Sequence, residues 1–220
     1  MHVTIKNLLK IEENVKNYLS TDIKNSKHPK VIAVSKTFKI DHIKPLINHG
    51  HLDFGENKVQ EAIEKWSEIK KEKQDIKLHL IGRLQSNKVK IALKIFDYIH
   101  SLDSKKLADK ISNYQKDFNN EIKIFIQVNI GKEEQKSGIN ENELDEFYQY
   151  CKNLNLNIIG LMCIPPFDED SSKYFINMKK LNKKFGFKEL SMGMSADYLK
   201  AIENESTFVR IGTDIFGRRY

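Results

Sequence analysis

The sequence contains few cysteines, and they form no recognisable set. Among its 220 residues only Cys151 and Cys163 are cysteines, the first in a predicted helix and the second in a predicted strand. They lack the spacing of metal ligands, and two isolated thiols do not make the disulfide framework of a small secreted domain. We therefore expect no metal site, reduced thiols and a cytoplasmic protein.

Long apolar runs are also absent. No stretch approaches the roughly 20 uninterrupted apolar residues that a membrane-spanning helix needs. The first residues, Met1 to Glu13, are amphipathic and already contain acidic side chains, which is not the pattern of a signal peptide. We expect no membrane partner.

Arginine is scarce, although the chain is basic. The formal net charge is +7, yet the only arginines are Arg83, Arg210, Arg218 and Arg219. The lysines are scattered through predicted helices and interleaved with Glu and Asp, a pattern typical of solvated helix faces. No arginine-rich run or recognised nucleic-acid-binding motif accompanies them. The charge therefore does not predict a nucleic-acid partner.

What the chain does contain is a regular alternation of strand and helix patterns. Apolar residues recur with helical spacing over residues 3–19, ahead of the first strand. Strands are then predicted at 31–35, 52–54, 78–81, 96–100, 122–129, 157–162, 189–191 and 207–211. Helices are predicted between them at 40–48, 56–71, 87–93, 104–118, 141–153, 171–185 and 195–203. For the helix over 104–118, Ser101 or Asp103 is the predicted N-cap.

Two α/β architectures fit this alternation: an open doubly wound sheet and a closed (β/α)8 barrel. Open sheets of this kind usually have five or six strands, whereas eight regular units favour closure. No long linker interrupts the chain, and 220 residues are typical of one domain rather than two. We predict a single domain over residues 1–220, a TIM-type (β/α)8 barrel with an extra N-terminal helix.

The first predicted strand runs directly into a lysine. Val31 to Ser35 is a short, β-branched run of the kind that parallel sheets bury on both faces, and Lys36 follows it. In barrels the carboxyl ends of the strands carry the active site. A lysine that is desolvated there can form a Schiff base with a carbonyl group. The alternative is a lysine that marks the strand end and extends its ammonium group into water.

The last two strand ends carry glycine and hydroxyl residues. Ser191-Met-Gly-Met-Ser195 belongs to the seventh strand end and Arg210-Ile-Gly-Thr213 to the eighth. The loops after strands seven and eight of such barrels commonly form a phosphate site. Glycine lets backbone N–H groups approach the oxygens, and hydroxyl groups add donors. Each cluster alone could be a turn with a capping serine, but together, on the rim that holds Lys36, they predict a phosphate pocket.

A phosphate pocket beside a Schiff-base lysine indicates either pyridoxal 5′-phosphate (PLP) or a phosphorylated sugar in an aldolase. Arg210 favours PLP, because an arginine keeps its proton and would leave a pyridine nitrogen unprotonated while donating to it. The alternative for Arg210 is a salt bridge with an acid such as Asp214. The aldolase has less support, because no residue marks a general acid for carbon–carbon cleavage.

A series of motifs extends over nearly the whole chain. In order they are Ile32-Ala-Val-Ser-Lys36, Phe54-Gly-Glu-Asn-Lys-Val-Gln-Glu61, His79-Leu-Ile-Gly-Arg-Leu-Gln-Ser-Asn-Lys88, Val128-Asn-Ile-Gly131 with Lys136-Ser-Gly138, Gly160-Leu-Met162, Leu190-Ser-Met-Gly-Met-Ser-Ala-Asp197, and Arg210-Ile-Gly-Thr-Asp-Ile-Phe-Gly217. Together they resemble the pyridoxal phosphate homeostasis protein family. One departure from the family pattern is Cys163, where relatives often carry threonine.

The resemblance implies a fold similar to the N-terminal barrel of alanine racemase, with PLP held as a Schiff base. The site residues that it implies are Lys36 for the Schiff base, Ser195, Gly212 and Thr213 around the phosphate, Arg210 near the pyridine nitrogen, and Asn57 and Met162 along the ring.

Two functions stay open under this resemblance. A racemase needs acid/base groups on both faces of the substrate carbon, and racemases of the alanine type take one from a second domain of the partner subunit. Because this chain ends at Tyr220, just past the eighth strand, we expect that domain to be absent and the protein to be a monomer. We therefore expect a PLP carrier or buffer in intracellular vitamin B6 homeostasis, which could exchange PLP with apo-enzymes. The alternative is a PLP-dependent amino-acid racemase.

Overall fold

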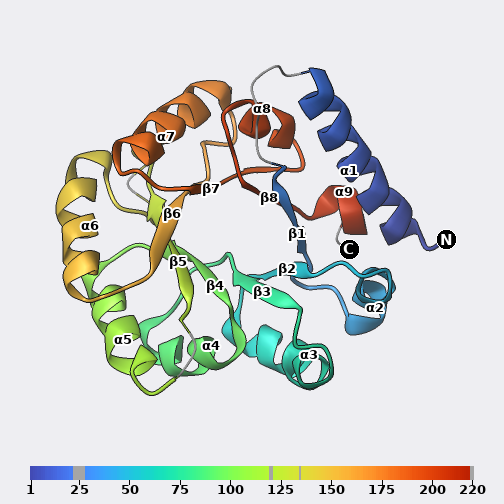
Figure 1. The fold of residues 1–220 in the computed structure, drawn as a ribbon, viewed down its shortest axis with the longest axis horizontal. Coiled ribbons are helices and arrows are strands. Elements are labelled where there is room, and N and C mark those ends of the chain that lie inside the picture. The colour runs from blue at the N-terminus through green and yellow to red at the C-terminus, as the bar shows by residue number, and fades with distance from the viewer. Residues whose placement is uncertain (22–27, 119–120, 134, 219–220) are drawn as a thin grey trace.

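Eight parallel strands close into a barrel in the computed structural model, which describes residues 1–21, 28–118, 121–133 and 135–218 (Figure 1). Each strand pairs with the next along the chain, and β8 pairs back with β1, where Lys30 lies opposite Phe208 and Ala33 opposite Ile211. This closure confirms the (β/α)8 barrel and rules out the open sheet, because no strand of the barrel is left as an edge.

The strands are β1 (Lys30–Val34), β2 (Asp53–Glu56), β3 (Lys77–Leu80), β4 (Tyr98–Leu102), β5 (Lys123–Val128), β6 (Ile158–Cys163), β7 (Glu189–Met194) and β8 (Phe208–Ile211). The α-helices are α1 (Val3–Thr21), α2 (Ile40–Asn48), α3 (Val59–Glu72), α4 (Val89–Ile95), α5 (Lys105–Gln115), α6 (Leu144–Asn153), α7 (Ser172–Lys184), α8 (Tyr198–Glu203) and α9 (Thr213–Phe216). Two short 3-10 helices, η1 (Ser86–Lys88) and η2 (Glu141–Glu143), lead into α4 and α6. No helix in the described part of the chain is long and apolar enough to cross a bilayer.

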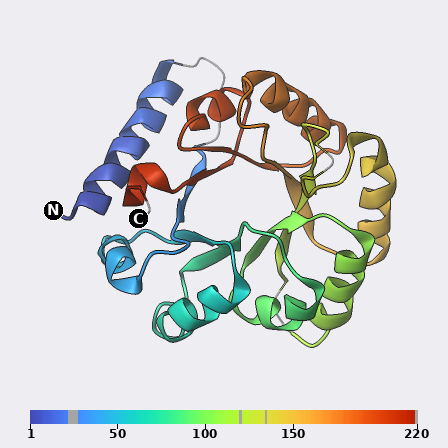
Figure 2. The same ribbon diagram turned by 180° about the vertical axis from the view of Figure 1, so that it is seen from behind.

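The extra N-terminal helix is confirmed. Its apolar stripe, which includes Leu8, Ile11 and Val15, is buried against the outside of the barrel. In both views α1 lies beside α9, the short helix that follows the last strand (Figures 1 and 2). The side-chain amide of Asn7 donates to the carbonyl oxygen of Ile215 at 3.0 Å. The first and last helices of the chain therefore cover the β1–β8 seam together.

One helix start differs from the sequence-based prediction. The N-cap of α5 is Ser104, whose hydroxyl accepts from the backbone N–H of Leu107, and neither Ser101 nor Asp103 serves. Ser101 instead donates its hydroxyl to the carbonyl oxygen of Gly82 at 2.7 Å. The predicted N-caps were wrong because β4 continues through Leu102, which moves the start of the helix along the chain.

A buried carboxylate connects β1, β2 and α3. The Glu56 side chain is fully buried, and its Oε1 accepts from Ser35 Oγ at 2.7 Å, Lys65 Nζ at 2.9 Å and Trp66 Nε1 at 2.9 Å. Lys65 Nζ also donates to the carbonyl oxygen of Ser35 at 2.9 Å. A charge is stable inside a protein only when it is paired and hydrogen-bonded, and this one has three donors. The network therefore fixes the end of β1.

The same network continues on the other side of Lys36. The next residue, Thr37, has a positive φ of 69°, and its backbone N–H donates to Glu61 Oε1. That oxygen also accepts from Lys65 Nζ at 2.9 Å. A positive φ is uncommon for a residue with a side chain and persists where the surroundings enforce it. The residues before and after Lys36 are thus both held by the Glu56–Lys65–Glu61 network.

The inside of the barrel combines an apolar cluster with two histidines. The apolar residues are Ile32, Tyr98, Phe125, Met162 and Phe208. His79 stacks on Tyr98 with ring centroids 4.2 Å apart, and His100 stacks on Phe125 at 4.4 Å. Both imidazoles are fully buried, so desolvation lowers the pKa of His79 and places that of His100 well below its ordinary value.

We predict that breaking the buried ion pair destabilises the barrel strongly. Lys65→Met keeps the length of the side chain but leaves Glu56 as a buried carboxylate without its cation. The expected loss is about 3–5 kcal/mol of unfolding free energy, measured by urea denaturation. The matched control is Lys44→Met, which breaks the exposed pair with Asp41 and should change stability little. Similar losses in the two variants would contradict this assignment.

We also predict that stability falls as the pH drops below about 6.5, the ordinary histidine pKa. The folded chain keeps His79 and His100 neutral, while the unfolded chain binds protons on both in that range. Folding then releases protons. The free energy of unfolding is therefore highest above pH 6.5 and decreases toward pH 5, by up to about 1.4 kcal/mol per pH unit for each histidine. Urea denaturation at pH 7, 6 and 5 measures this slope. His49→Gln, which removes an exposed histidine, should leave it unchanged, and a flat profile would contradict the prediction.

Candidate functional site

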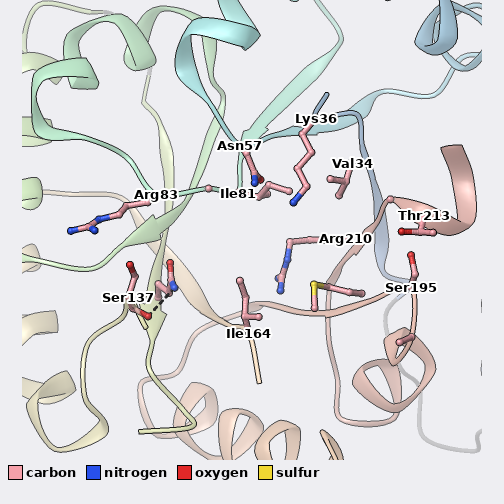
Figure 3. Close-up of a pocket in the computed structure, with 15 residues that line it drawn as sticks. Val34, Lys36, Asn57, Ile81, Arg83, Ser137, Ile164, Ser195, Arg210 and Thr213 are labelled. Atoms are coloured by element: carbon pink, nitrogen blue, oxygen red, sulfur yellow. Dashed lines mark hydrogen bonds between the residues drawn. The ribbon is translucent and has the colours of Figure 1, made fainter. Parts of the chain in front are cut away.

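A cavity of about 420 Å³ opens at the carboxyl ends of the strands (Figure 3). Residues from several strand ends and the loops that follow them line it. They are Val34, Lys36, Asn57, Ile81, Gly82, Arg83, Gln127, Ser137, Ile164, Met194, Ser195, Ala196, Arg210, Gly212 and Thr213. Because parallel strands all end on the same rim, residues far apart in the chain meet here.

Six of the seven residues predicted for the site line this cavity: Lys36, Asn57, Ser195, Arg210, Gly212 and Thr213. The seventh, Met162, does not. Its side chain is fully buried in the apolar cluster inside the barrel, with Ile32 and Phe125. Of the other strand-end residues, Asn129 is engaged in its own loop, where its amide donates to the carbonyl oxygen of Glu133 at 2.8 Å. Gln85 is exposed and belongs to a neighbouring hollow.

The polar groups divide the cavity into two parts. The ends of the Lys36 and Asn57 side chains point into its centre, above the guanidinium of Arg210 (Figure 3). The hydroxyl oxygens of Ser195 and Thr213 point toward one another at one side. Arg83, at the opposite side, extends away from the centre. An elongated ligand can therefore place an anionic end between the two hydroxyls and its middle between Lys36 and Arg210.

The hydroxyl side of the cavity is built by two tight turns. Gly193 has a φ of +90°, and a Cβ there would lie 2.5 Å from Ala201 Cβ, so only glycine fits. After it, Asp197 Oδ1 accepts from the backbone N–H of Met194 at 2.7 Å and shapes the turn that presents Ser195. Gly212 is the N-cap of α9, and Thr213 is its first residue. Backbone N–H groups at such a helix start suit an anion.

Arg210 forms part of the cavity floor. It is almost completely buried, and its guanidinium donates to Ser191 Oγ at 2.6 Å and to the carbonyl oxygen of Cys163 at 2.9 Å. Its hydrogen bonds thus go to neutral acceptors and not to Asp214. Desolvation lowers the pKa of Arg210, but an arginine starts so high that it stays protonated near neutral pH. The floor therefore carries a positive charge.

The cavity is lined by donors and cations. Among the lining residues that the structure describes there is no Asp, Glu, His, Tyr or Cys. No group of three metal-ligating side chains occurs in the described ranges either. Its polar side chains are hydroxyls, amides, one amine and two guanidinium groups, which suit a ligand that is anionic and carries a carbonyl group. PLP has both features, so the donor set fits it.

Sequence reasoning missed several residues that line the wall of the cavity. Gln127, near the end of β5, donates through Nε2 to the carbonyl oxygen of Ser137 at 3.0 Å and attaches that loop to the barrel. A polar residue within the apolar run 122–128 was a signal for Gln127. Ser137 lies in one of the family motifs. Met194 lies within the predicted cluster at the seventh strand end, whereas nothing in the pattern indicated that Ile164 supplies apolar surface to the cavity.

Comparisons with known proteins agree with this geometry. The sequence profile of the alanine racemase N-terminal domain matches residues 7–219. The pyridoxal phosphate homeostasis protein of Aquifex aeolicus is 41% identical over 202 residues, which are 86% of this chain and 87% of that protein.

Solved structures of other proteins share the fold of this chain. PipY of Synechococcus elongatus, with PLP bound, matches with a TM-score of 0.81 and 32% identity, over 94% of this chain and 100% of PipY. An alanine racemase of Clostridium difficile shares the fold alone, with a TM-score of 0.72 and 18% identity over 99% of this chain and 57% of the racemase. The chain therefore belongs to the pyridoxal phosphate homeostasis protein family and has the barrel fold of the alanine racemase N-terminal domain.

Proposed function

We propose that this protein binds PLP as a Schiff base on Lys36 and serves as a carrier or buffer in PLP homeostasis. Bound PLP supplies an aldehyde carbon that reacts with amines and a phosphate that fixes its position. The single observation that carries the proposal is the cavity itself, in which a strand-end lysine faces a buried arginine next to a pair of hydroxyls. The relatives named for PLP homeostasis and the PLP-bound PipY structure support it.

Each residue contributes a separate interaction. Ser195 and Thr213 donate their hydroxyls to the phosphate, with the backbone N–H groups that start at Gly212. Arg210 donates to the pyridine nitrogen and, because it keeps its proton, leaves that nitrogen unprotonated. Asn57 donates along the edge of the ring. Met162 does not line the cavity, so we assign it a supporting role in the packing beneath the floor.

The lining residues also favour a carrier over an enzyme. A racemase needs one acid/base group on each face of the substrate carbon. Among the lining residues that the structure describes, Lys36 is the one side chain of a type that serves as a general acid or base, because no Asp, Glu, His, Tyr or Cys accompanies it. Holding PLP on that amine keeps the aldehyde from modifying other amines, and release to an apo-enzyme requires only exchange of the imine at Lys36. We place this role in a cytoplasmic monomer that acts as one domain.

We predict that the cofactor and its lysine can be identified together by absorption spectroscopy. The purified protein loaded with PLP should show a visible imine band that borohydride reduction converts into a covalent adduct. Lys36→Ala should lack both the band and the adduct. The matched control is Lys39→Ala, which removes an exposed lysine three residues along the same segment and should retain both. A band that survives in Lys36→Ala would place the Schiff base elsewhere.

We further predict that the PLP-loaded protein does not catalyse proton exchange at the α-carbon of alanine. In heavy water, deuterium incorporation followed by NMR should not exceed that of free PLP at the same concentration, since no lining residue in the described ranges supplies the second acid/base group. Incorporation well above that level, and lost in Lys36→Ala, would establish the racemase alternative instead.

A further inference from the structure

A continuous row of hydrogen-bonded side chains crosses the inside of the barrel. Starting at the cavity, Arg210 donates to Ser191 Oγ at 2.6 Å, and Ser191 Oγ lies 2.9 Å from His100 Nδ1. His100 Nε2 lies 3.0 Å from His79 Nδ1, and His79 Nε2 lies 3.0 Å from Asp53 Oδ1. The five residues come from β8, β7, β4, β3 and β2. Four of them, all but Asp53, are buried.

The two ends of the row lie at opposite mouths of the barrel. Arg210 lies at the carboxyl ends of the strands, in the cavity with Lys36. Asp53 is the first residue of β2, so it lies at the amino ends, where its side chain is 18% exposed and borders a second hollow of about 330 Å³. The row therefore joins a cation at one mouth to a carboxylate at the other.

The chemistry of the ends fixes the direction of every hydrogen bond in the row. An arginine can only donate, and an ionised carboxylate can only accept. Burial raises the pKa of Asp53, but the His79 hydrogen bond and the nearby Lys30 ammonium act against it, and that pKa lies below its ordinary value. Asp53 is thus ionised, and the proton of His79 lies on Nε2.

The proton positions on the residues between Asp53 and Arg210 follow from the ionised state of Asp53. His79 is neutral, so its Nδ1 has no proton and accepts from His100 Nε2. His100 is neutral as well, so its Nδ1 accepts from the hydroxyl of Ser191. Ser191 Oγ is then left to accept from Arg210. Both histidines carry their proton on Nε2, and all bonds run from Arg210 toward Asp53.

Packing around the two imidazole rings disfavours flipped ring orientations. Each imidazole is stacked on an aromatic ring, His79 on Tyr98 and His100 on Phe125, and Phe208 lies against both. A ring flip would exchange a nitrogen for a carbon at both ends of the imidazole and break two hydrogen bonds in a buried place, where an unpaired polar group is costly.

We propose that Ser191, His100, His79 and Asp53 are positioning residues that hold the Arg210 guanidinium in the PLP cavity and couple it to the charge of Asp53 at the far mouth. This inference rests on the proposed function only where PLP is the probe. Hydrogen bonds in a row polarise one another, so the negative end strengthens each bond up to Arg210. Removing that charge should therefore change the hydrogen bonding of His100 and the affinity of the cavity for PLP, although Asp53 contacts neither.

The first test needs no cofactor. Long-range ¹H–¹⁵N NMR of the histidine rings in the PLP-free protein at pH 7 should show His79 and His100 as neutral imidazoles protonated on Nε2. A proton on Nδ1 of either ring, or a doubly protonated ring, would overturn the row as described. This outcome is independent of whether the protein binds PLP.

The second test removes the charge at the far mouth and keeps the shape. Asp53→Asn should shift the ring-nitrogen signals of His100, which Asp53 does not touch, and raise the PLP dissociation constant about fivefold, the scale of one hydrogen bond's net contribution. The control is Asp75→Asn, which removes an exposed carboxylate from the loop before β3, on the same side of the barrel. It should change neither quantity. A shift confined to His79, with unchanged PLP affinity, would overturn the coupling.

A double-mutant cycle separates coupling through the row from any other effect of Asp53. Ser191→Ala interrupts the row next to Arg210, so Asp53→Asn should weaken PLP binding in the normal background but add nothing in the Ser191→Ala background. Equal effects in both backgrounds would overturn the proposal. If the unchanged protein fails to bind PLP, the proposed function fails, and the NMR experiments alone decide whether the row exists.

Discussion

The carboxylate of Glu56 is the constraint on which the geometry of the site depends. Its side chain has no exposure to solvent, and Ser35, Lys65 and Trp66 all donate to its Oε1, with Lys65 as its ion-pair partner. Those donors belong to the end of β1 and to α3. The same hydrogen bonds therefore hold α3 against the barrel and fix the residue before Lys36.

The charged and polar groups of the cavity favour binding of PLP over catalysis with it. Its described lining offers donors and cations to a ligand, and no carboxylate or imidazole competes for them. An anionic aldehyde is held well by such a surface. Yet the same surface lacks a second group with which to move protons, so the features that favour retention of PLP also limit chemistry on its substrates.

Sequence reasoning predicted the barrel, because eight short strands alternating with helices leave few other closed arrangements. It also predicted Lys36, Gly212 and Thr213, since any residue directly after a strand lies on the shared rim. It failed where the answer depends on which way a side chain points within a strand. Both faces of these strands are buried, so there is no apolar–polar alternation to reveal the inward residues. The family resemblance implied Met162 along the ring, yet its side chain lies in the apolar cluster inside the barrel and does not line the cavity.

The hydrogen-bond partners of Arg210 explain how its guanidinium can be buried and still offer a positive charge to a ligand in the cavity. A carboxylate beside it would be the simplest partner, but it would cancel the positive charge of the floor and place a negative one where an anion must bind. Ser191 and the carbonyl oxygen of Cys163 instead satisfy the guanidinium without neutralising it. Burial raises the pKa of the Cys163 thiol to about 12, so that group is neutral too. The balancing carboxylate, Asp53, lies at the other mouth, with two neutral histidines in between. The separation of charge along the barrel axis thus keeps the cation effective toward the cavity.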